Sequence, residues 1–592
     1  MDIRYLTEST DEVVQALNGV NIFSLDIETT GLNPLDSRIV LCQIGLSDVV
    51  YVINAAISLR PLLPFLESVK WRKIIQNSKF ERRFFLNKYN IEINNVFDTQ
   101  LAERILFPDQ FNYGLAALAQ KYSDITLDKS IRMSFVDKKK ISLSSEQIEY
   151  AAKDAEVLWP IMNGQIEKLR QHDMESLAEM EFDLAQVVAS MEDTGTPIDQ
   201  PKWRNKIMEY EKLHEQSRLN MHDIIFTDNS LDEQLGIFSR DSINLNSAAQ
   251  VKAAFLKIGI NIDATNEREI SLINHPAARE LLEYRGLQKI LSSYGQTFLD
   301  KIHPFTQRIH ADFSQIGTET GRFSCKEPNL QQMPDEFRQC VSLENFSIVG
   351  ADYANIELRI LAELSEDAAF MSAFEGDGDP HKSTASMMFK IPLSSVTKQQ
   401  RFIAKTINFG ISYGMGAGKL MDILNTEAQK NKSPKLTYPQ VQDLLSRYHH
   451  TYKKASQWLT DTANFGLVNG YSTTMLGRKR FYNHPDPNIL SEDDYKKQVG
   501  AIRRKAANSP IQGTNADITK LAMLNVYKEL KEGGYQANLI IQVHDELVVL
   551  AHKRQAESVK NVLVKSMKDA GSSILKNVPV KSDAYISDIW KK

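Results

Sequence analysis

Residues 539–550, LIIQVHDELVVL, place three consecutive polar side chains between two apolar, β-branched runs. Each run predicts a buried strand. An unpaired carboxylate buried between them would cost several kcal/mol, so Asp545 and Glu546 require a structural or a chemical reason. A tight turn would be the structural reason, because it would expose His544 and Asp545 at the tip of a hairpin. A bound cation would be the chemical one.

The composition is that of a folded protein with several domains. At 592 residues the chain is too long for one core, and about three to five domains are expected. Hydrophobic residues form 42% of the chain and charged residues 24%, which argues against disorder. Three scattered cysteines, a polar N-terminus and the lack of a long apolar run predict a reducing, cytoplasmic location without a membrane span.

The net charge of −5 does not exclude a nucleic acid partner, because basic residues are gathered locally. Residues 396–420 carry four basic side chains and no acidic one, and RKR (478–480) and RRK (503–505) add two more basic groups. Acidic residues concentrated at metal sites would offset these patches in the total.

Three regions of different character follow one another along the chain. The first 170 residues alternate strand-like and helical stretches, which predicts an α/β domain over residues 1–171. Residues 172–300 are mostly helical in pattern, whereas residues 301–592 combine short strands, long helices and the acidic segment described above. We therefore place domain boundaries near residues 171 and 300.

A second acidic strand strengthens the cation interpretation. Residues 346–364, FSIVGADYANIELRILAEL, form an apolar strand ending in Asp352, followed by a helix from about Asn355. Two carboxylates at strand ends in one domain suit a pair of Mg²⁺ ions, which prefer oxygen ligands. Two ions about 3.5–4 Å apart can activate an attacking oxygen and stabilise a leaving one in phosphoryl transfer.

The segment RFIAKTINFGISYG predicts a helix with one functional face. Arg401, Lys405, Phe409 and Tyr413 recur at every fourth residue, which places them together on a helix. Two cations and two aromatic rings suit a triphosphate and a base to stack upon. The alternative is an ordinary amphipathic helix with its Lys and Arg heads in solvent.

The segments DYANIELR, RxxxKxxxFGxxYG and QVHDEL resemble, in this order, the three polymerase motifs of family A DNA polymerases, the class of bacterial DNA polymerase I and its Klenow fragment. TGRFSCKEPNLQQMP (320–334), GDPH (378–381) and RRKAANSPIQGTNADI (503–518) extend the resemblance over essentially the whole chain. It implies a multidomain α/β and α+β protein. An RNase H-like 3′-5′ exonuclease domain would precede a right-hand polymerase with thumb, palm with an antiparallel sheet, and helical fingers at roughly 370–480. The implied activity is DNA-dependent DNA synthesis with proofreading, in replication or repair.

The resemblance also implies roles for individual residues. Metal ions would be held by Asp352 and Asp545, with Glu546 as an accessory carboxylate, and Glu357 would crowd the 2′ position and exclude ribonucleotides. The incoming dNTP would contact Arg401, Lys405, His381, Phe409 and Tyr413. Lys405 would also be a catalytic residue. Template-primer DNA or the nascent pair would contact Arg322, Asn329, Gln331, Arg504, Asn508, Gln512 and His544.

Carboxylates recur on a strand near the N-terminus, in NIFSLDIETTGL (21–32). Asp26 and Glu28 lie two apart and so share a strand face, while Tyr150 and Asp154 lie four apart and share a helix face. A DxE pair alone is often only a solvent-facing pair. The whole set resembles the DEDD exonuclease with a tyrosine, which implies metal binding by Asp26, Glu28 and Asp154 and orientation of the attacking water by Tyr150.

The second exonuclease motif departs from the family pattern. It reads N77-SKF-E81, where aspartate is usual, and the extra methylene would shift the carboxylate oxygens by about 1 Å. We expect Glu81 to be the remaining metal ligand of an active exonuclease. The alternative is a decayed domain with only a structural role. Asp98 is a further acid nearby, outside the usual set.

The resemblance implies two Mg²⁺ ions per active site, for which Mn²⁺ can substitute, with primer-template DNA and dNTPs as partners of a monomer. The sequence does not indicate whether a helicase, a single-strand-binding protein or a clamp is a partner. The compartment would be a nucleoid or phage-infected bacterial cytoplasm, or an organelle. Because the exonuclease strand begins the chain, no 5′-nuclease domain is expected. A pure nuclease whose C-terminal part only binds DNA and a non-catalytic binding protein are the alternatives, and the presence of Asp352, Asp545, Arg401 and Lys405 argues against both.

Overall fold

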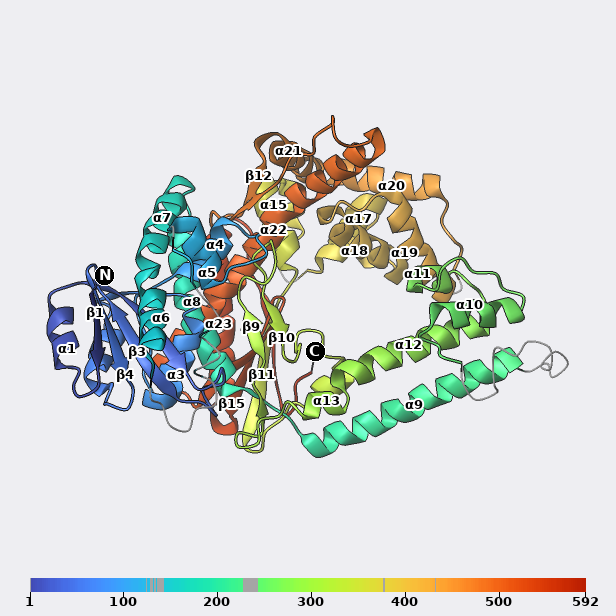
Figure 1. Ribbon diagram of the computed structural model, residues 1–592. Coiled ribbons are helices and arrows are strands. Elements are labelled where there is room, and N and C mark those ends of the chain that lie inside the picture. The colour runs from blue at the N-terminus through green and yellow to red at the C-terminus, as the bar shows by residue number, and fades with distance from the viewer. Residues whose placement is uncertain are drawn as a thin grey trace. The chain divides into compact units, whose positions relative to one another are not determined.

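The computed structural model of the protein describes residues 2–123, 125–127, 131, 135, 143–226, 243–375, 378–431 and 433–591 (Figure 1). Backbone contacts divide the chain into two compact units. Unit 1 comprises Met1–Thr194, Phe313–Ser324 and Val349–Ile586, and unit 2 comprises Gly195–Asp312, Cys325–Ile348 and Ser587–Lys592. The domain boundaries expected near residues 171 and 300 remain predictions.

The N-terminal part of unit 1 is an α/β fold around a mixed six-stranded sheet with the order β1-β4-β3-β2-β5-β6. β1 pairs with β4, β2 with β5 and β5 with β6 in parallel, whereas β3 is antiparallel to β2 and to β4. The strands are β1 Asp2–Leu6, β2 Ile22–Thr29, β3 Ile39–Gly45, β4 Val49–Asn54, β5 Arg72–Ile75 and β6 Val96–Asp98. The helices are α1 Asp11–Asn18, α2 Leu63–Glu67, α3 Lys79–Tyr89, α4 Thr99–Leu106, α5 Leu115–Tyr122, α6 Ser145–Glu156, α7 Leu158–Gln171 and α8 Glu175–Thr194.

The core of this fold explains why β2 can carry acids. Phe23 and Leu25 of β2 pack in one apolar cluster with Ile44 of β3 and Phe84 of α3. α6 begins at a capping box formed by Ser144 and Gln147 and packs on β2, β3 and β4. The buried apolar residues fix the strand, so the helix face with Tyr150 and Asp154 meets the face of β2 with the acids.

The C-terminal part of unit 1 contains a four-stranded sheet with the order β14-β15-β11-β16. β14 (Ala537–Val543) and β15 (Glu546–His552) are antiparallel, and their connection is the predicted turn at His544 and Asp545. β11 (Phe346–Tyr353) and β16 (Ser582–Ser587) complete the sheet. Thus the acidic segment is a hairpin, which is the tight-turn interpretation of the sequence.

Helices make up most of the rest of this part. They are α15 Ile356–Ser365, α16 Ala368–Ser372, α17 Pro380–Phe389, α18 Lys398–Ser412, α19 Ala417–Lys430, α20 Tyr438–Thr451, α21 Lys453–Asn469, α22 Glu492–Glu532 and α23 Ala556–Ile574. A short hairpin of β12 (Tyr471–Thr473) and β13 (Lys479–Phe481) precedes α22. Figure 1 shows α17, α18, α19 and α20 grouped together, and the assignment of residues 370–480 as fingers stays a prediction.

Unit 2 is mostly helical. It contains α9 Gln200–Phe226, α10 Ala248–Lys257, α11 Glu267–Ser271, α12 Pro276–Tyr294, α13 Gln296–Leu299 and α14 Asp335–Arg338, with the short strands β7 Thr196–Pro197 and β8 Arg308–Ile309. α9 and α12 pack along each other, and Trp203 stacks on Phe298 with ring centres 4.1 Å apart (Figure 1). The predicted helical character of 172–300 is confirmed apart from residues 227–242, which lie outside the described residues.

Among the described residues, no helix has both the length and the apolar character needed to cross a membrane.

Candidate active sites

Three carboxylates converge in the N-terminal fold. Asp26 and Glu28 extend from β2 and Asp154 from α6, and one oxygen of each lies within 4.8 Å of the other two. Glu28 and Asp154 are buried. Three like charges this close in a buried setting repel one another unless a cation balances them. The arrangement therefore suits a divalent metal with oxygen ligands.

Tyr150 lies one helical turn before Asp154, and their side chains are hydrogen-bonded. Burial raises the pKa of the Tyr150 hydroxyl, and the charges of Asp154, Glu28 and Asp26 raise it further. The hydroxyl therefore keeps its proton at neutral pH. It can donate a hydrogen bond beside the carboxylates but cannot serve there as a base.

Glu81, in the first turn of α3, is only 2% exposed. Burial raises the pKa of the Cys42 thiol, and the carboxylates of Asp26 and Glu81 raise it further, so both acids act on the same buried thiol. Glu81 is not part of the group whose oxygens lie within 4.8 Å. Its role as a metal ligand stays a prediction.

Asp98 has a structural role that sequence reasoning left undefined. Its carboxylate caps α4 by accepting from the backbone N–H groups of Gln100 at 2.9 Å and Leu101 at 3.0 Å. It also accepts from the backbone of Asn77 at 3.2 Å and Ser78 at 2.6 Å. Asp98 thus fixes the turn that leads into α3 and Glu81.

Asp352 and Asp545 lie on neighbouring parts of the C-terminal sheet. Asp352 is the next-to-last residue of β11, and Asp545 lies in the turn that leads into β15, the neighbour of β11. The backbone N–H of Tyr353 donates to the carbonyl of Asp545 at 3.4 Å, so the two acidic segments are in contact. Within the described part of the chain, these two acids do not belong to a group of three like that of Asp26.

The hairpin also explains the buried acid of the opening segment. Glu546 is 1% exposed at the start of β15, and the hydroxyl of Tyr585 on β16 donates to its Oε1 at 3.0 Å. His544 adopts the left-handed conformation, with φ of 56°, and is exposed. The turn therefore exposes His544 while the sheet holds Glu546.

α18 confirms the predicted helix face. Arg401, Lys405 and Phe409 of α18 and its C-cap residue Tyr413 are all exposed, while Ile403, Ala404, Ile407, Asn408 and Ile411 are buried. Phe409 is 36% exposed and Tyr413 is 43% exposed. Arg401 forms an ion pair with Asp379, the residue that caps α17. Sequence reasoning missed this partner, although Asp379 belongs to the GDPH segment it singled out.

His381, near the start of α17, is 4% exposed and faces α18. The side-chain amide nitrogen of Asn408 lies 3.0 Å from Nδ1 of His381. Because an amide nitrogen only donates, Nδ1 accepts and Nε2 carries the proton. Burial, with help from the charges of Arg401 and Lys405, lowers the pKa of His381 to about 4 against the opposing effect of Asp379. The neutral imidazole therefore presents an Nε2–H donor.

Glu357 connects two other predicted residues. It lies in the first turn of α15, is 9% exposed, and forms an ion pair with Arg322 through Oε1. The Tyr413 hydroxyl donates to its Oε2 at 3.0 Å. Burial, followed by the charge of Glu357, raises the pKa of Tyr413. The structure thus brings Arg322, Glu357 and Tyr413 together.

Three predicted DNA contacts lie one helical turn apart on α22: Arg504, Asn508 and Gln512. The Gln512 side chain accepts from Thr320 Oγ1 at 2.8 Å and bonds to Tyr413. Asn329 and Gln331 belong to unit 2, where the Tyr294 hydroxyl donates to the Asn329 carbonyl at 3.0 Å and the Gln331 N–H donates to Asn329 Oδ1 at 3.0 Å. Their relation to the residues of unit 1 stays a prediction.

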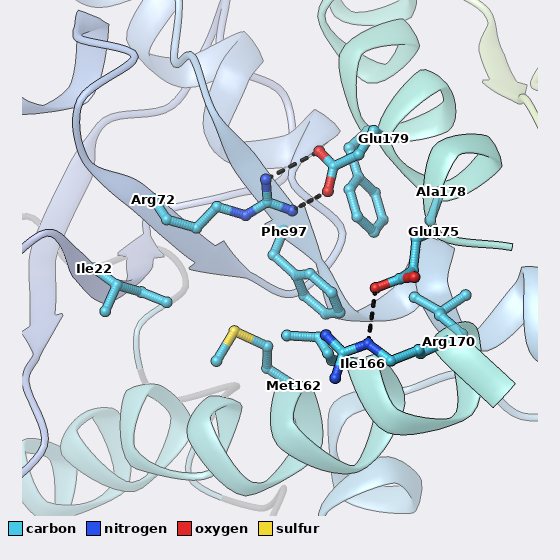
Figure 2. Close-up of a pocket in the computed structure, with 11 residues that line it drawn as sticks. Ile22, Arg72, Phe97, Met162, Ile166, Arg170, Glu175, Ala178 and Glu179 are labelled. Carbon is cyan, nitrogen blue, oxygen red and sulfur yellow. Dashed lines mark hydrogen bonds and ion pairs between the residues drawn. The ribbon is translucent and has the colours of Figure 1, made fainter. Parts of the chain in front are cut away.

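A cavity of about 340 Å³ lies between β5, α7 and α8, and none of the predicted site residues lines it. Figure 2 shows Arg72 extended toward Glu179 across the apolar lining, with hydrogen bonds of 2.6 and 2.9 Å between them. The apolar residues around it include Phe97, Met162 and Phe182. It is a feature of the fold separate from the carboxylates of β2.

Comparison with known proteins agrees with this geometry. A family described as DNA polymerase family A matches residues 212–592, and one described as 3′-5′ exonuclease matches residues 5–185. DNA polymerase I of Aquifex aeolicus is 30% identical to this chain over the full length of both. DNA polymerase I of Borreliella burgdorferi is 28% identical over 98% of this chain and 63% of its own length. The thermostable DNA polymerase I of Thermus aquaticus is 33% identical over 70% of this chain and 48% of its own length.

The chain therefore spans all of the Aquifex protein but less than two thirds of the other two relatives. Among solved structures, the POL domain of Pol1 from M. smegmatis, in complex with DNA primer-template and dNTP, aligns over 99% of both chains with a TM-score of 0.84. At 22% identity this likeness establishes the fold. Matched over most of its length by one family and over its N-terminal third by the other, the chain belongs to DNA polymerase family A and carries a 3′-5′ exonuclease domain.

Proposed function

We propose that the protein copies a DNA template by adding dNTPs to a primer, and removes 3′-terminal nucleotides at a second site. One observation carries the polymerase part. The hydrogen bond from Tyr413 to Glu357 joins the cationic, aromatic face of α18 to the segment that directly follows Asp352. Carboxylates, cations and stacking surfaces for a nucleotide are thereby gathered in unit 1.

The residues fit divalent cations at both sites. Asp26, Glu28 and Asp154 offer only oxygen atoms in a compact, largely buried group, and Asp352 and Asp545 offer oxygens at adjoining strand ends. We assign Mg²⁺ to both, with Mn²⁺ as a substitute. When bound, such ions would neutralise phosphate charge and lower the pKa of an attacking hydroxyl or water.

The side chains of α17 and α18 would bind the triphosphate. Lys405 and Arg401 supply positive charge, and His381 supplies the Nε2–H donor. Arg401 must exchange its ion pair with Asp379 for one with phosphate. The exposed rings of Phe409 and Tyr413 would then face the sugar and base.

The remaining predicted residues would select and hold the other substrates. Glu357, held on both oxygens, would occupy the space that a 2′-hydroxyl needs. Arg504, Asn508 and Gln512 on α22, with Arg322, would contact the DNA without reading its sequence, as template copying requires. At the exonuclease site Tyr150 would orient the attacking water by donating its proton in a hydrogen bond.

The test uses the full chain and two variants on a primed oligonucleotide with Mg²⁺. Asp545→Ala should abolish primer extension but keep degradation of single-stranded 3′ ends, and Asp26→Ala should do the reverse. Asp569→Ala, at an exposed position of α23, serves as the control for loss of a carboxylate. Extension that survives in Asp545→Ala would overturn the polymerase assignment, and degradation that survives in Asp26→Ala would overturn the exonuclease assignment.

A further inference from the structure

Four charged side chains are buried together in unit 1, outside both proposed sites. Glu181 lies on α8, Arg478 precedes β13, and Asp517 and Lys520 lie on α22. Glu181, Asp517 and Lys520 are 0% exposed and Arg478 is 5% exposed. Glu181 falls within the exonuclease match and the other three within the polymerase match. We call these four residues the buried ion cluster.

The buried ion cluster is closed by specific bonds. Glu181 Oε1 pairs with both Arg478 and Lys520, and Arg478 donates from Nε to Asp517 Oδ1 at 2.8 Å. The remaining carboxylate oxygens accept from Gln315 at 2.6 Å and Thr474 at 2.8 Å. Two positive and two negative charges balance, as buried charges require. Although burial opposes ionisation, Lys520 and Arg478 hold the pKa of Glu181 below its usual value.

The cluster supports the loop that carries Arg322. Gly321 has a φ of +80°, and a Cβ at this position would lie 2.6 Å from Arg478 Nε, so the Arg478 side chain lies directly against the loop backbone. The two residues next to Gly321 make further contacts, because Arg322 pairs with Glu357 and Thr320 donates to Gln512. The loop is thus held between the buried ion cluster and the carboxylate proposed to exclude ribonucleotides.

We propose that Glu181 is a positioning residue for sugar selection at the polymerase site. It touches no substrate. Its charge holds Arg478, Arg478 sets the backbone at Gly321, and that backbone aims Arg322 at Glu357. This inference rests on the proposed function, in particular on the role of Glu357. According to this inference, α8, the helix that follows the exonuclease sheet, contributes to the selection of dNTPs over rNTPs at the polymerase site.

Loss of the charge at Glu181 has a definite consequence. Glu181→Gln leaves Arg478 and Lys520 with only Asp517 to balance them, which is one uncompensated positive charge in a dry environment. Arg478 then moves toward Asp517 or toward water, and the support against Gly321 is lost. Adding Lys520→Met removes the excess charge and should restore the position of Arg478.

The experiment measures kcat/KM for a dNTP and for the matching rNTP in the full-length protein. Glu181→Gln should lower the dNTP-to-rNTP ratio at least about tenfold, and Glu181→Gln with Lys520→Met should recover most of it. The matched control is Glu192→Gln, which removes another buried acid of α8, one paired with Lys79 and Arg83. This control should lower the unfolding temperature without changing the ratio.

A second variant approaches the same contact from the loop. Gly321→Ala leaves all four charges in place but forces Arg478 and the loop apart, so it should lower the ratio as well. It keeps the inference testable if Glu181→Gln does not fold. An unchanged ratio in folded Glu181→Gln or in Gly321→Ala overturns the inference. Glu357→Ala in the same assay distinguishes failure of this inference from failure of the proposed function. An unchanged ratio in Glu357→Ala means that the proposed role of Glu357 is wrong.

Discussion

Tyr413 donates a hydrogen bond of 3.0 Å to Glu357 Oε2, while Arg322 pairs with Oε1 of the same carboxylate. Both oxygens are therefore held, one by the residue that caps α18 and the other by the loop before β10 (Ser324–Lys326). A carboxylate fixed in this way can exclude a hydroxyl group by position instead of by charge.

Tyr413→Phe is predicted to weaken sugar selection in part. The variant keeps the ring and removes one hydrogen bond to a charged group, worth about 1.5–3 kcal/mol. Because Arg322 still holds the other oxygen, we expect the dNTP-to-rNTP ratio of kcat/KM to fall about threefold to tenfold. Steady-state incorporation of single nucleotides measures it. A fall as large as that of Glu357→Ala would mean that the Tyr413 hydroxyl alone positions Glu357 and that Arg322 does not compensate for its loss.

Glu81→Gln is predicted to lower exonuclease activity at least about 30-fold and to leave primer extension unchanged. The amide removes the negative charge that a metal ligand needs, at nearly the same side-chain volume. Release of the 3′-terminal nucleotide from single-stranded DNA measures it. Glu67→Gln, exposed at the end of α2, is the control. Full activity in Glu81→Gln would favour a three-carboxylate site without Glu81.

Asp379→Asn is predicted to tighten dNTP binding. Asparagine still caps α17, but it no longer competes with phosphate for Arg401. The pair is partly exposed, so we expect a gain of only about 1 kcal/mol, or about fivefold in Kd. Asp443→Asn, which breaks the exposed pair with Arg447 on α20, is the control. Weaker binding in Asp379→Asn would mean that this pair organises the site.

His381 predicts a pH-dependent stability. Its pKa is about 4 in the folded protein and 6.5 ordinarily, so between these pH values the unfolded chain binds a proton that the folded chain does not. The free energy of unfolding therefore rises with pH through this window, and the rise ends above 6.5. At most, the effect is on the order of 3 kcal/mol.

Comparison with His381→Gln isolates this contribution from that of the carboxylates. The advantage of the wild type over the variant should shrink as the pH falls from about 7 to about 4, as followed by denaturant unfolding. His484→Gln, at an exposed position, should show no such trend. A pH-independent difference for His381→Gln would contradict the lowered pKa.

Local pattern was enough to predict the elements that carry the sites. The four-residue spacing from Arg401 to Tyr413 predicts an exposed face of α18. The apolar runs around His544 predict the β14–β15 hairpin. In both, side-chain periodicity along a few turns or strand residues determines which positions are buried. The pairing of Asp26 and Glu28 with Asp154 followed from the resemblance, and the structure brings the three together.

Long-range ion pairs could not be predicted in this way. Glu181 lies in an unremarkable helical stretch, and its partners Arg478 and Lys520 are 297 and 339 residues away in sequence. No periodicity relates such distant positions, and a glutamate in a helix is expected in solvent. The ion pair of Arg401 with Asp379 and the contacts of Asp98 with the turn before α3 could not be predicted either. Both depend on the tertiary packing of segments that are separate in sequence.

α8 carries two buried acids with different partners. Glu192 pairs with Lys79 and Arg83 of the helix that bears Glu81, and Glu181 pairs with Arg478 and Lys520 in the interior next to the Arg322 loop. A polypeptide trimmed to begin at Glu175 would retain the pairs of Glu181. A polypeptide trimmed to begin at Gly195 would lack Glu181, so the buried guanidinium of Arg478 and ammonium of Lys520 would be balanced by Asp517 alone. The proposed proofreading activity is therefore better removed by replacing one carboxylate than by deleting the region that contains it.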